Sequence, residues 1–292
     1  MATIAELLAQ HQHLQAVSDS PLLDVELLLC HCLQKPRSYL RAWPEAQIPV
    51  DAEHGFQKLL RRRQRGEPVA YLTGERGFWS LDLTVNSATL IPRPETEMLV
   101  EKSLDLLADN AKASVLDLGT GSGAIALALA AERPQWRIAA CDRESAAVAL
   151  AETNRRRYML HNVSIFQSDW FAEVDSQRFD LIVSNPPYID PEDPHLQRGD
   201  LRFEPRSALV AGRQGLADIE HIIGTAGAFL HHRAWLLFEH GYNQAEAARS
   251  LLLRAGFSEV FTDRDLAGLD RISGGRFCRP GPGVDEQRGS GL

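Results

Sequence analysis

Strand and helix patterns alternate along the second part of the chain, and this alternation limits the possible folds. Short apolar runs typical of buried strands are separated by helical patterns of small and apolar residues. The predicted strands cover residues 115–118, 136–141, 163–166, 179–183, 234–238, 257–262 and 272–277. The predicted helices cover residues 124–131, 146–160, 215–230 and 244–255. Such alternation predicts an α/β domain with a mostly parallel seven-stranded sheet and helices on both of its faces.

The first part of the chain has a different pattern, in which leucines recur at helical spacing. Leu7, Leu8 and Leu14 begin this pattern, and its last helical segment ends at Gly66, where Pro68 reinforces the end. Aromatic and alternating apolar residues then indicate a β-hairpin. We therefore expect four parts: a helical domain over residues 1–68, a hairpin linker over 69–92, the α/β domain over 93–279 and a disordered tail over 280–292.

The balance of charge counts against binding to a nucleic-acid backbone. The formal net charge is −8, whereas proteins that bind many phosphates normally have a basic surface. Residues 61–65 include four arginines, which we interpret as the solvated end of a helix. A contact with an acidic or RNA-bound partner is the alternative for these arginines. We expect no direct binding to DNA.

The cysteines and histidines do not have the spacing of a metal site. Cys30, Cys32, Cys141 and Cys278 are spread along the chain, and the ten histidines form no cluster. We therefore expect reduced thiols and no metal.

Because no apolar stretch is long enough to span a bilayer, and the N-terminus resembles no signal peptide, we expect a cytoplasmic protein without membrane contact. We also expect it to be a monomer.

A glycine-rich turn follows the first strand of the α/β domain. Its residues are Gly119, Thr120, Gly121, Ser122 and Gly123. Glycines at these positions let the backbone turn sharply and let a ligand lie against the main chain. The third glycine comes one residue earlier than in the dinucleotide-binding pattern, which counts against a nicotinamide or flavin dinucleotide. Alone, such a turn is a weak signal, because nicotinamide and flavin enzymes share it.

Two further residues are expected to contact the cofactor. Asp142 ends the second strand, where an acidic side chain accepts hydrogen bonds from both ribose hydroxyls. The alternative for Asp142 is a helix cap. Trp170 follows the third strand, where its ring is expected to stack on adenine; the alternative is a core aromatic residue.

The segment Asn185-Pro186-Pro187-Tyr188 follows the fourth strand and has no ordinary packing explanation. Two prolines remove two backbone N–H donors and stiffen the turn. The Asn185 side-chain oxygen and the Pro186 carbonyl can each accept one N–H of a planar amine, and Tyr188 offers a face for stacking. Such acceptors would orient the nitrogen and stabilise the positive charge that develops on it during alkylation. This segment predicts a site that binds a planar –NH2 group, and it resembles the signature of enzymes that methylate planar nitrogen.

Together the glycine turn, Asp142 and the Asn-Pro-Pro-Tyr segment resemble those of a Rossmann-like S-adenosylmethionine-dependent methyltransferase. Five further segments extend this resemblance to the bacterial peptide chain release factor glutamine N5-methyltransferase family, from the helical N-terminus to about Phe277. They are residues 66–74, Phe78-Trp79, residues 90–97, residues 184–189 and Phe203-Glu204-Pro205.

The resemblance implies a protein-glutamine methyltransferase that uses S-adenosyl-L-methionine and supports translation termination. Its substrate would be the glutamine of the Gly-Gly-Gln motif in class 1 release factors, docked with the help of the N-terminal helices. Residues 119–123, Asp142, Trp170 and Asn185 would contact the cofactor, and Asn185 to Tyr188 the glutamine, with Asn185, Pro186 and Tyr188 as the catalytic groups.

Two other functions remain open from the residues alone. An adenine or guanine N-methyltransferase acting on DNA or RNA would use the same Asn-Pro-Pro-Tyr chemistry, but it would need to extrude a base and normally has a basic strand-binding surface. A non-catalytic cofactor-binding protein would have no use for the intact segment.

Overall fold

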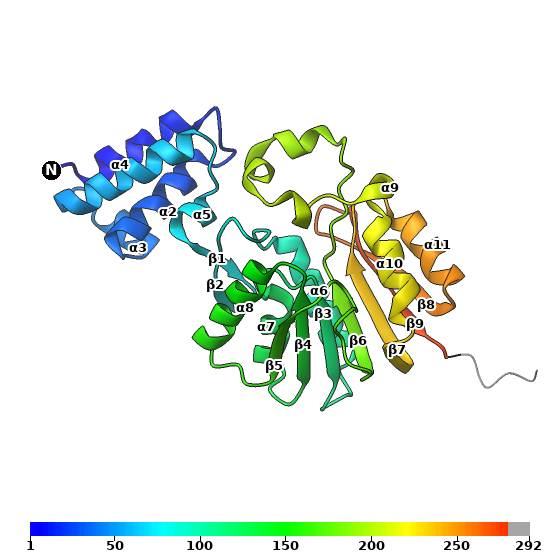
Figure 1. The fold of residues 1–292 in the computed structure, drawn as a ribbon. Coiled ribbons are helices and arrows are strands. Elements are labelled where there is room, and N and C mark those ends of the chain that lie inside the picture. Colours follow the sequence, from blue (N-terminus) through cyan, green and yellow to red (C-terminus); the bar gives the residue numbers. More distant parts are fainter. Residues whose placement is uncertain (280–292) are drawn as a thin grey trace, which may run out of the picture. The chain divides into compact units, whose positions relative to one another are not determined.

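The computed structural model describes residues 1–279, and these residues form two compact units (Figure 1). The helical unit consists of residues 1–77, 82–91 and 192–206, and the sheet unit consists of the rest of the described chain. The segment 192–206 was expected to be part of the α/β domain, but its contacts group it with the helical unit. The tail that we expected over residues 280–292 lies outside the described residues.

The helical unit packs short helices around an apolar core. Its helices are α1 (Ile4–Leu8), η1 (Ala9–Leu14), α2 (Pro21–Leu33), α3 (Arg37–Ala42), α4 (Val50–Gln64), α5 (Val69–Thr73), η3 (Pro194–Gln197) and η4 (Gly199–Phe203). Leu28 and Phe56 are completely buried in the core, and they come from α2 and α4. The hairpin of β1 (Glu75–Phe78) and β2 (Leu81–Thr84) is a separate two-stranded sheet.

Helix α5 differs from the expected hairpin linker. Pro68 precedes its first residue with an extended backbone, and Gly74 ends it with a φ of 76°. Because Pro is well suited to the start of a helix and Gly to a left-handed end, these two residues enclose one short helix. The β-hairpin therefore begins only at Glu75.

The basic run at the end of α4 is only partly solvated. Arg63 is 6% exposed and donates to Asp24 Oδ2 at 2.7 Å and to the carbonyl oxygens of Gly66 and Val17. Arg62 pairs with Glu67. The expectation of a solvated helix end is therefore wrong for Arg63, whose guanidinium is used inside the helical unit.

The sheet unit contains seven strands in the order β5-β4-β3-β6-β7-β9-β8 (Figure 1). Their bounds are β3 (Ser114–Leu118), β4 (Arg137–Asp142), β5 (Val163–Gln167), β6 (Phe179–Ser184), β7 (Leu230–Glu239), β8 (Phe257–Arg264) and β9 (Asp270–Phe277). Neighbouring strands from β5 to β7 are parallel, and β9 is antiparallel to both β7 and β8. The expected mostly parallel seven-stranded sheet is confirmed.

The remaining helices belong to the sheet unit or lead into it. They are η2 (Pro94–Thr96), α6 (Glu97–Leu106), α7 (Ala124–Glu132), α8 (Ser145–Arg157), η5 (Arg206–Ala208), α9 (Gly212–Gly215), α10 (Ala217–Ala226) and α11 (Ala245–Arg254). Ile222 of α10 and Leu252 of α11 pack in one buried cluster with Ile182 and Leu236 of the sheet. Along residues 1–279, no helix has both the length and the apolar character that a membrane span requires.

Candidate functional site

Three of the predicted site segments leave the sheet at the same edge. Leu118 of β3 is paired with Cys141 of β4 and with Ser184 of β6. Because these strands are parallel, the residues that follow them emerge side by side. The glycine turn, Asp142 and Asn185 are therefore brought together at the carboxyl edge, where open α/β sheets bind ligands.

The glycine turn adopts a conformation that favours glycine. Gly119, Gly121 and Gly123 have φ values of 70°, 58° and 88°. The buried carboxylate of Asp117, at the end of β3, holds the turn: Thr120 Oγ1 donates to its Oδ2 at 2.7 Å, and the Ala126 amide donates to the same oxygen at 3.2 Å. The turn is therefore tied to both β3 and the start of α7.

Asp142 holds both the glycine turn and the segment that leads into α8. Its Oδ2 accepts from the Gly121 amide at 2.9 Å, and its Oδ1 accepts from the Glu144 amide at 3.0 Å. Glu144 lies just before Ser145, the first residue of α8, and this helix has no side-chain hydrogen bond at its N-cap, so the helix-cap alternative is wrong. A carboxylate has about four lone pairs, so each oxygen retains capacity for a further donor such as a hydroxyl. Burial raises the pKa of Asp142, and the two amide donors oppose that rise.

The indole of Trp170 lies against the glycine turn. A Cβ atom placed on Gly119 would be 3.5 Å from Cζ3 of this ring. Trp170 is also partly buried against the core cluster of the sheet unit, and its φ is 51°. The ring thus packs on the core, as the alternative expected, and still borders the turn.

The Asn-Pro-Pro-Tyr segment is anchored by side-chain hydrogen bonds to other elements. Asn185 Nδ2 donates to Thr96 Oγ1 at 3.0 Å, and the hydroxyl of Tyr188 donates to Glu239 Oε1 at 2.9 Å. Gln244 Nε2 donates to the carbonyl oxygen of Tyr188 at 3.0 Å. Both ends of the segment are therefore held by side chains from outside it.

Gly215 is needed for this arrangement. A Cβ atom at Gly215 would lie 2.0 Å from the carbonyl oxygen of Tyr188, and its φ is 82°. A larger residue would displace the backbone just after the two prolines.

The predicted site residues did not include Thr96, Glu239 and Gln244. Glu239 is 1% exposed at the end of β7, and it joins Thr96 to Tyr188 because Thr96 Oγ1 donates to its Oε2 at 2.7 Å. The one available signal was that an acidic residue ends a strand of the same parallel sheet. Thr96 lies 89 residues before Asn185, and no local pattern connects the two.

The neighbouring His240 belongs to a different network. Its Nδ1 lies 2.9 Å from the Gly241 carbonyl oxygen, which can only accept, so Nδ1 carries the proton. Its Nε2 lies 2.8 Å from Ser273 Oγ. Burial lowers the pKa of His240. This imidazole is a hydrogen-bonded core group.

Burial also shapes the electrostatics of the Asn-Pro-Pro-Tyr segment. Burial, and then the charge of Glu239, raise the pKa of Tyr188 well above its ordinary value. Burial raises the pKa of Glu239 as well, while its hydrogen bonds from Thr96 and Tyr188 lower it. The Tyr188 hydroxyl therefore keeps its proton and is the donor to Glu239. Over residues 1–279, no group of three or more His, Cys, Asp or Glu side chains is arranged to hold a metal.

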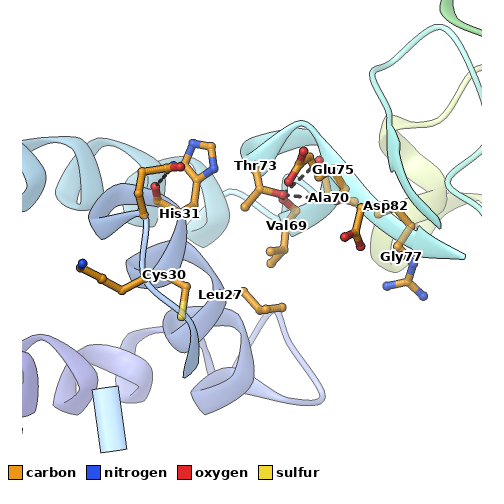
Figure 2. Close-up of a pocket in the computed structure, with 12 residues that line it drawn as sticks. Leu27, Cys30, His31, Val69, Ala70, Thr73, Glu75, Gly77 and Asp82 are labelled. Carbon is orange, nitrogen blue, oxygen red and sulfur yellow. Dashed lines mark hydrogen bonds between the residues drawn. The ribbon is translucent and has the colours of Figure 1, made fainter. Parts of the chain in front are cut away.

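The helical unit contains a pocket of its own, with a volume of about 500 Å³. Figure 2 shows that it is lined by residues of α2, α5 and the β-hairpin, among them His31, Thr73 and Asp82. None of the predicted cofactor or glutamine contacts lines this pocket.

The fold agrees with a known class of enzymes. A solved methyltransferase from Pyrococcus furiosus superposes with a TM-score of 0.51 at 16% identity, covering 76% of this chain and 98% of that structure. At this identity the likeness concerns the fold alone. The family model described as the methyltransferase small domain matches residues 95–199.

Sequence relatives are much closer. The family model of the PrmC N-terminal domain matches residues 5–74. A release factor glutamine methyltransferase of Pseudomonas aeruginosa is 54% identical, over 95% of this chain and 100% of the relative. One from Shewanella oneidensis is 52% identical, over 94% and 96% of the two chains. The chain therefore belongs to the release factor glutamine methyltransferase family.

Proposed function

We propose that this enzyme transfers a methyl group from S-adenosyl-L-methionine to the N5 atom of the glutamine in the Gly-Gly-Gln motif of class 1 peptide chain release factors. The observation that carries the proposal is the position of Asn185, which follows β6 directly beside the glycine turn that follows β3. Two relatives support the choice of a release factor as substrate: they are about half identical over nearly the whole chain, and both are named release factor glutamine methyltransferase.

The residues at the carboxyl edge fit an S-adenosyl ligand. Gly119 and Gly121 are partly exposed and, without a Cβ atom, let a ligand approach the backbone of the turn. The carboxylate of Asp142 is fixed at the end of the adjacent strand, where it would accept from the ribose hydroxyls. The face of Trp170 beside Gly119 would contact the adenine. We propose that Thr120, Ser122 and Asn185 complete the set of cofactor contacts.

When bound, the cofactor would supply an electrophilic methyl group on a positively charged sulfur, which is left as a neutral thioether when the methyl–sulfur bond breaks. The amide nitrogen of glutamine is a weak nucleophile, because its lone pair is delocalised into the carbonyl group. Asn185 Oδ1 and the Pro186 carbonyl oxygen would each accept one N–H and so orient this nitrogen toward the methyl. Pro187 limits the movement of these acceptors, and Tyr188 would stack on the planar amide.

The same acceptors would also stabilise the developing charge. As the nitrogen takes the methyl it becomes positive, and the two oxygens already point at its protons. One of these protons then leaves for solvent, which yields the neutral N5-methyl amide. No strong base is required before the transfer, since the proton becomes acidic only once the nitrogen carries charge.

The helical unit is proposed to dock the release factor, with the hairpin as part of its connection to the sheet unit. We propose that the enzyme is cytoplasmic, which a substrate that works in translation supports. We propose that it acts as a monomer and has no direct role in binding DNA.

Methylation of a purified class 1 release factor tests the proposal. The full chain is incubated with labelled S-adenosyl-L-methionine and the release factor, and mass spectrometry should find one methyl group on the peptide that contains Gly-Gly-Gln. A release factor with this glutamine replaced by asparagine is the matched control and should take up no label. Label that enters DNA or ribosomal RNA, but not the release factor, would favour the nucleobase methyltransferase and contradict the proposal.

A further inference from the structure

Four side chains of the sheet unit form a continuous chain of hydrogen bonds that ends at Asn185. Tyr188 and Thr96 donate to the two oxygens of Glu239, and Asn185 donates to Thr96. These residues come from η2, from the end of β6 and from the end of β7. These hydrogen bonds thus join parts of the sequence that are separated by up to 143 residues.

The direction of each hydrogen bond follows from the groups involved. The Thr96 and Tyr188 hydroxyls each donate to one oxygen of Glu239, and these two hydrogen bonds favour the ionised carboxylate, which can only accept. The Thr96 hydroxyl has a single proton, and it is used for Glu239 Oε2 at 2.7 Å. Toward Asn185, Thr96 Oγ1 can therefore only accept. The atom of the Asn185 amide that faces Thr96 must then be the nitrogen, as found at 3.0 Å.

This polarity decides where the other half of the amide points. In a carboxamide the oxygen and the nitrogen lie on opposite sides of the carbon, so a nitrogen fixed at Thr96 directs Oδ1 away from Thr96. If Thr96 instead donated to Asn185, the amide would rotate by half a turn and present its N–H groups to the substrate. Two N–H donors would then face each other, and the substrate nitrogen would lose an acceptor.

Because Glu239 and Thr96 are buried, their hydrogen bonds constrain the orientation of the Asn185 amide strongly. Glu239 is 1% exposed and Thr96 is 4% exposed, so water has little access to either group. An unsatisfied buried donor or acceptor costs more free energy than one in solvent. The network therefore favours one orientation of the Asn185 amide over the other.

We propose that Glu239 is a positioning residue, which acts through Thr96 to fix the Asn185 amide with its oxygen toward the glutamine nitrogen. The inference rests on the proposed role of Asn185 as an acceptor for that nitrogen. Glu239 does this without touching substrate, and it also holds the ring of Tyr188 through the phenolic hydroxyl.

Substitution of Glu239 by glutamine tests the polarity with little change in shape. The new –NH2 group would donate to Thr96 or Tyr188, and donation to Thr96 would free the Thr96 proton to turn toward Asn185. We expect Glu239→Gln and Thr96→Val to lower kcat by about tenfold or more, with the affinity for the cofactor changed by less than about threefold. Thr96→Ser keeps the hydroxyl and should retain most of the rate.

Ser273→Ala is the matched control. It removes a buried hydroxyl that is hydrogen-bonded to His240 Nε2 and Thr262 Oγ1, and neither of these groups belongs to the series of hydrogen bonds that ends at Asn185. This variant should lose stability while it keeps kcat. Equal losses of kcat in Ser273→Ala and Glu239→Gln would show that general destabilisation is the cause, and would overturn the positioning role.

A measurement without release factor separates this inference from the proposed function. The side-chain amide of Asn185 gives an NMR signal that is assigned by its absence in Asn185→Ala. Its hydrogen-bonded N–H should shift in Thr96→Val and in Glu239→Gln but stay unchanged in Ser273→Ala. An unchanged signal in Glu239→Gln would overturn the inference. Failure of the wild-type enzyme to methylate a release factor would overturn only the proposed substrate, because the amide signal still reports the orientation.

Discussion

Asp117 and Glu239 are both fully buried carboxylates near the same edge of the sheet, but their hydrogen bonds differ. Glu239 has a hydroxyl donor on each oxygen. Asp117 receives both of its donors on Oδ2, and within the described residues its Oδ1 has no hydrogen-bond partner. The donors of Glu239 come from distant segments, whereas those of Asp117 lie three and nine residues away. Glu239 therefore connects elements, while Asp117 shapes one turn.

Burial and hydrogen bonding also determine the pH at which Asp117 ionises. Burial raises the pKa of Asp117 to about 7, although Thr120 and the Ala126 amide lower it in part. The native state then holds a proton on Asp117 at pH values where the unfolded chain has lost it. A group with such a raised pKa contributes stability that is present at low pH and lost as the pH rises toward about 7.

The largest expected effect is that of Asp117→Asn on the pH dependence of the free energy of unfolding. In the wild type, ionisation of Asp117 should reduce the free energy of unfolding by on the order of 4 kcal/mol between about pH 4 and about pH 8. The asparagine variant cannot ionise and should lose this part of the pH dependence. Urea unfolding at several pH values measures it, with the exposed Asp109→Asn as the control that keeps the wild-type slope. An unchanged slope in Asp117→Asn would mean that Asp117 is ionised without penalty.

Asn185→Ala tests whether the hydrogen bonds of Glu239, Thr96 and Asn185 support catalysis. Loss of a directed acceptor should lower kcat by about 100-fold or more, since such groups act mainly on the transition state. Turnover with a release factor measures the effect, and thermal unfolding serves as the check on folding. A rate near that of the wild type would leave the network with a structural role alone.

Asp142→Ala should weaken cofactor binding by about tenfold to about 100-fold, as the loss of hydrogen bonds to a charged group would. Titration calorimetry with S-adenosyl-L-methionine gives the dissociation constant. Asp142→Asn is the companion variant, because its one oxygen can still accept from a local amide. Unchanged affinity in both variants would contradict the ribose contact.

The smallest effect is expected for Thr120→Val. It removes one of the two donors to Asp117 and should cost about 1 kcal/mol of unfolding free energy. Because the hydrogen bond from Thr120 lowers the pKa of Asp117, its loss should move the pH dependence to higher pH. Unfolding curves recorded over the same pH series as for Asp117→Asn would show both changes, and a shift to lower pH would contradict the assignment.

The succession of strands and helices along the sequence of the sheet unit could be predicted, because strands such as β3 and β6 contain a short apolar run. The edge where Asp142 and Asn185 meet also followed from the sequence, since parallel strands align their carboxyl ends. Contacts such as that of Thr96 with Glu239 could not be predicted, because they depend on the three-dimensional course of 143 intervening residues. The same holds for Arg63, whose buried partner Asp24 comes from a different helix 39 residues earlier.

The segment 192–206 has a practical consequence for dividing the protein into pieces. It is grouped with the helical unit, where Glu204 Oε1 accepts from the Ile91 amide and Asp200 lies 3.8 Å from Arg63. A truncated protein that starts at residue 93 would keep this segment but lose Ile91 and Arg63 as its partners. The first 92 residues are thus not a detachable module, and a chimera that exchanges the helical unit must carry residues 192–206 with it.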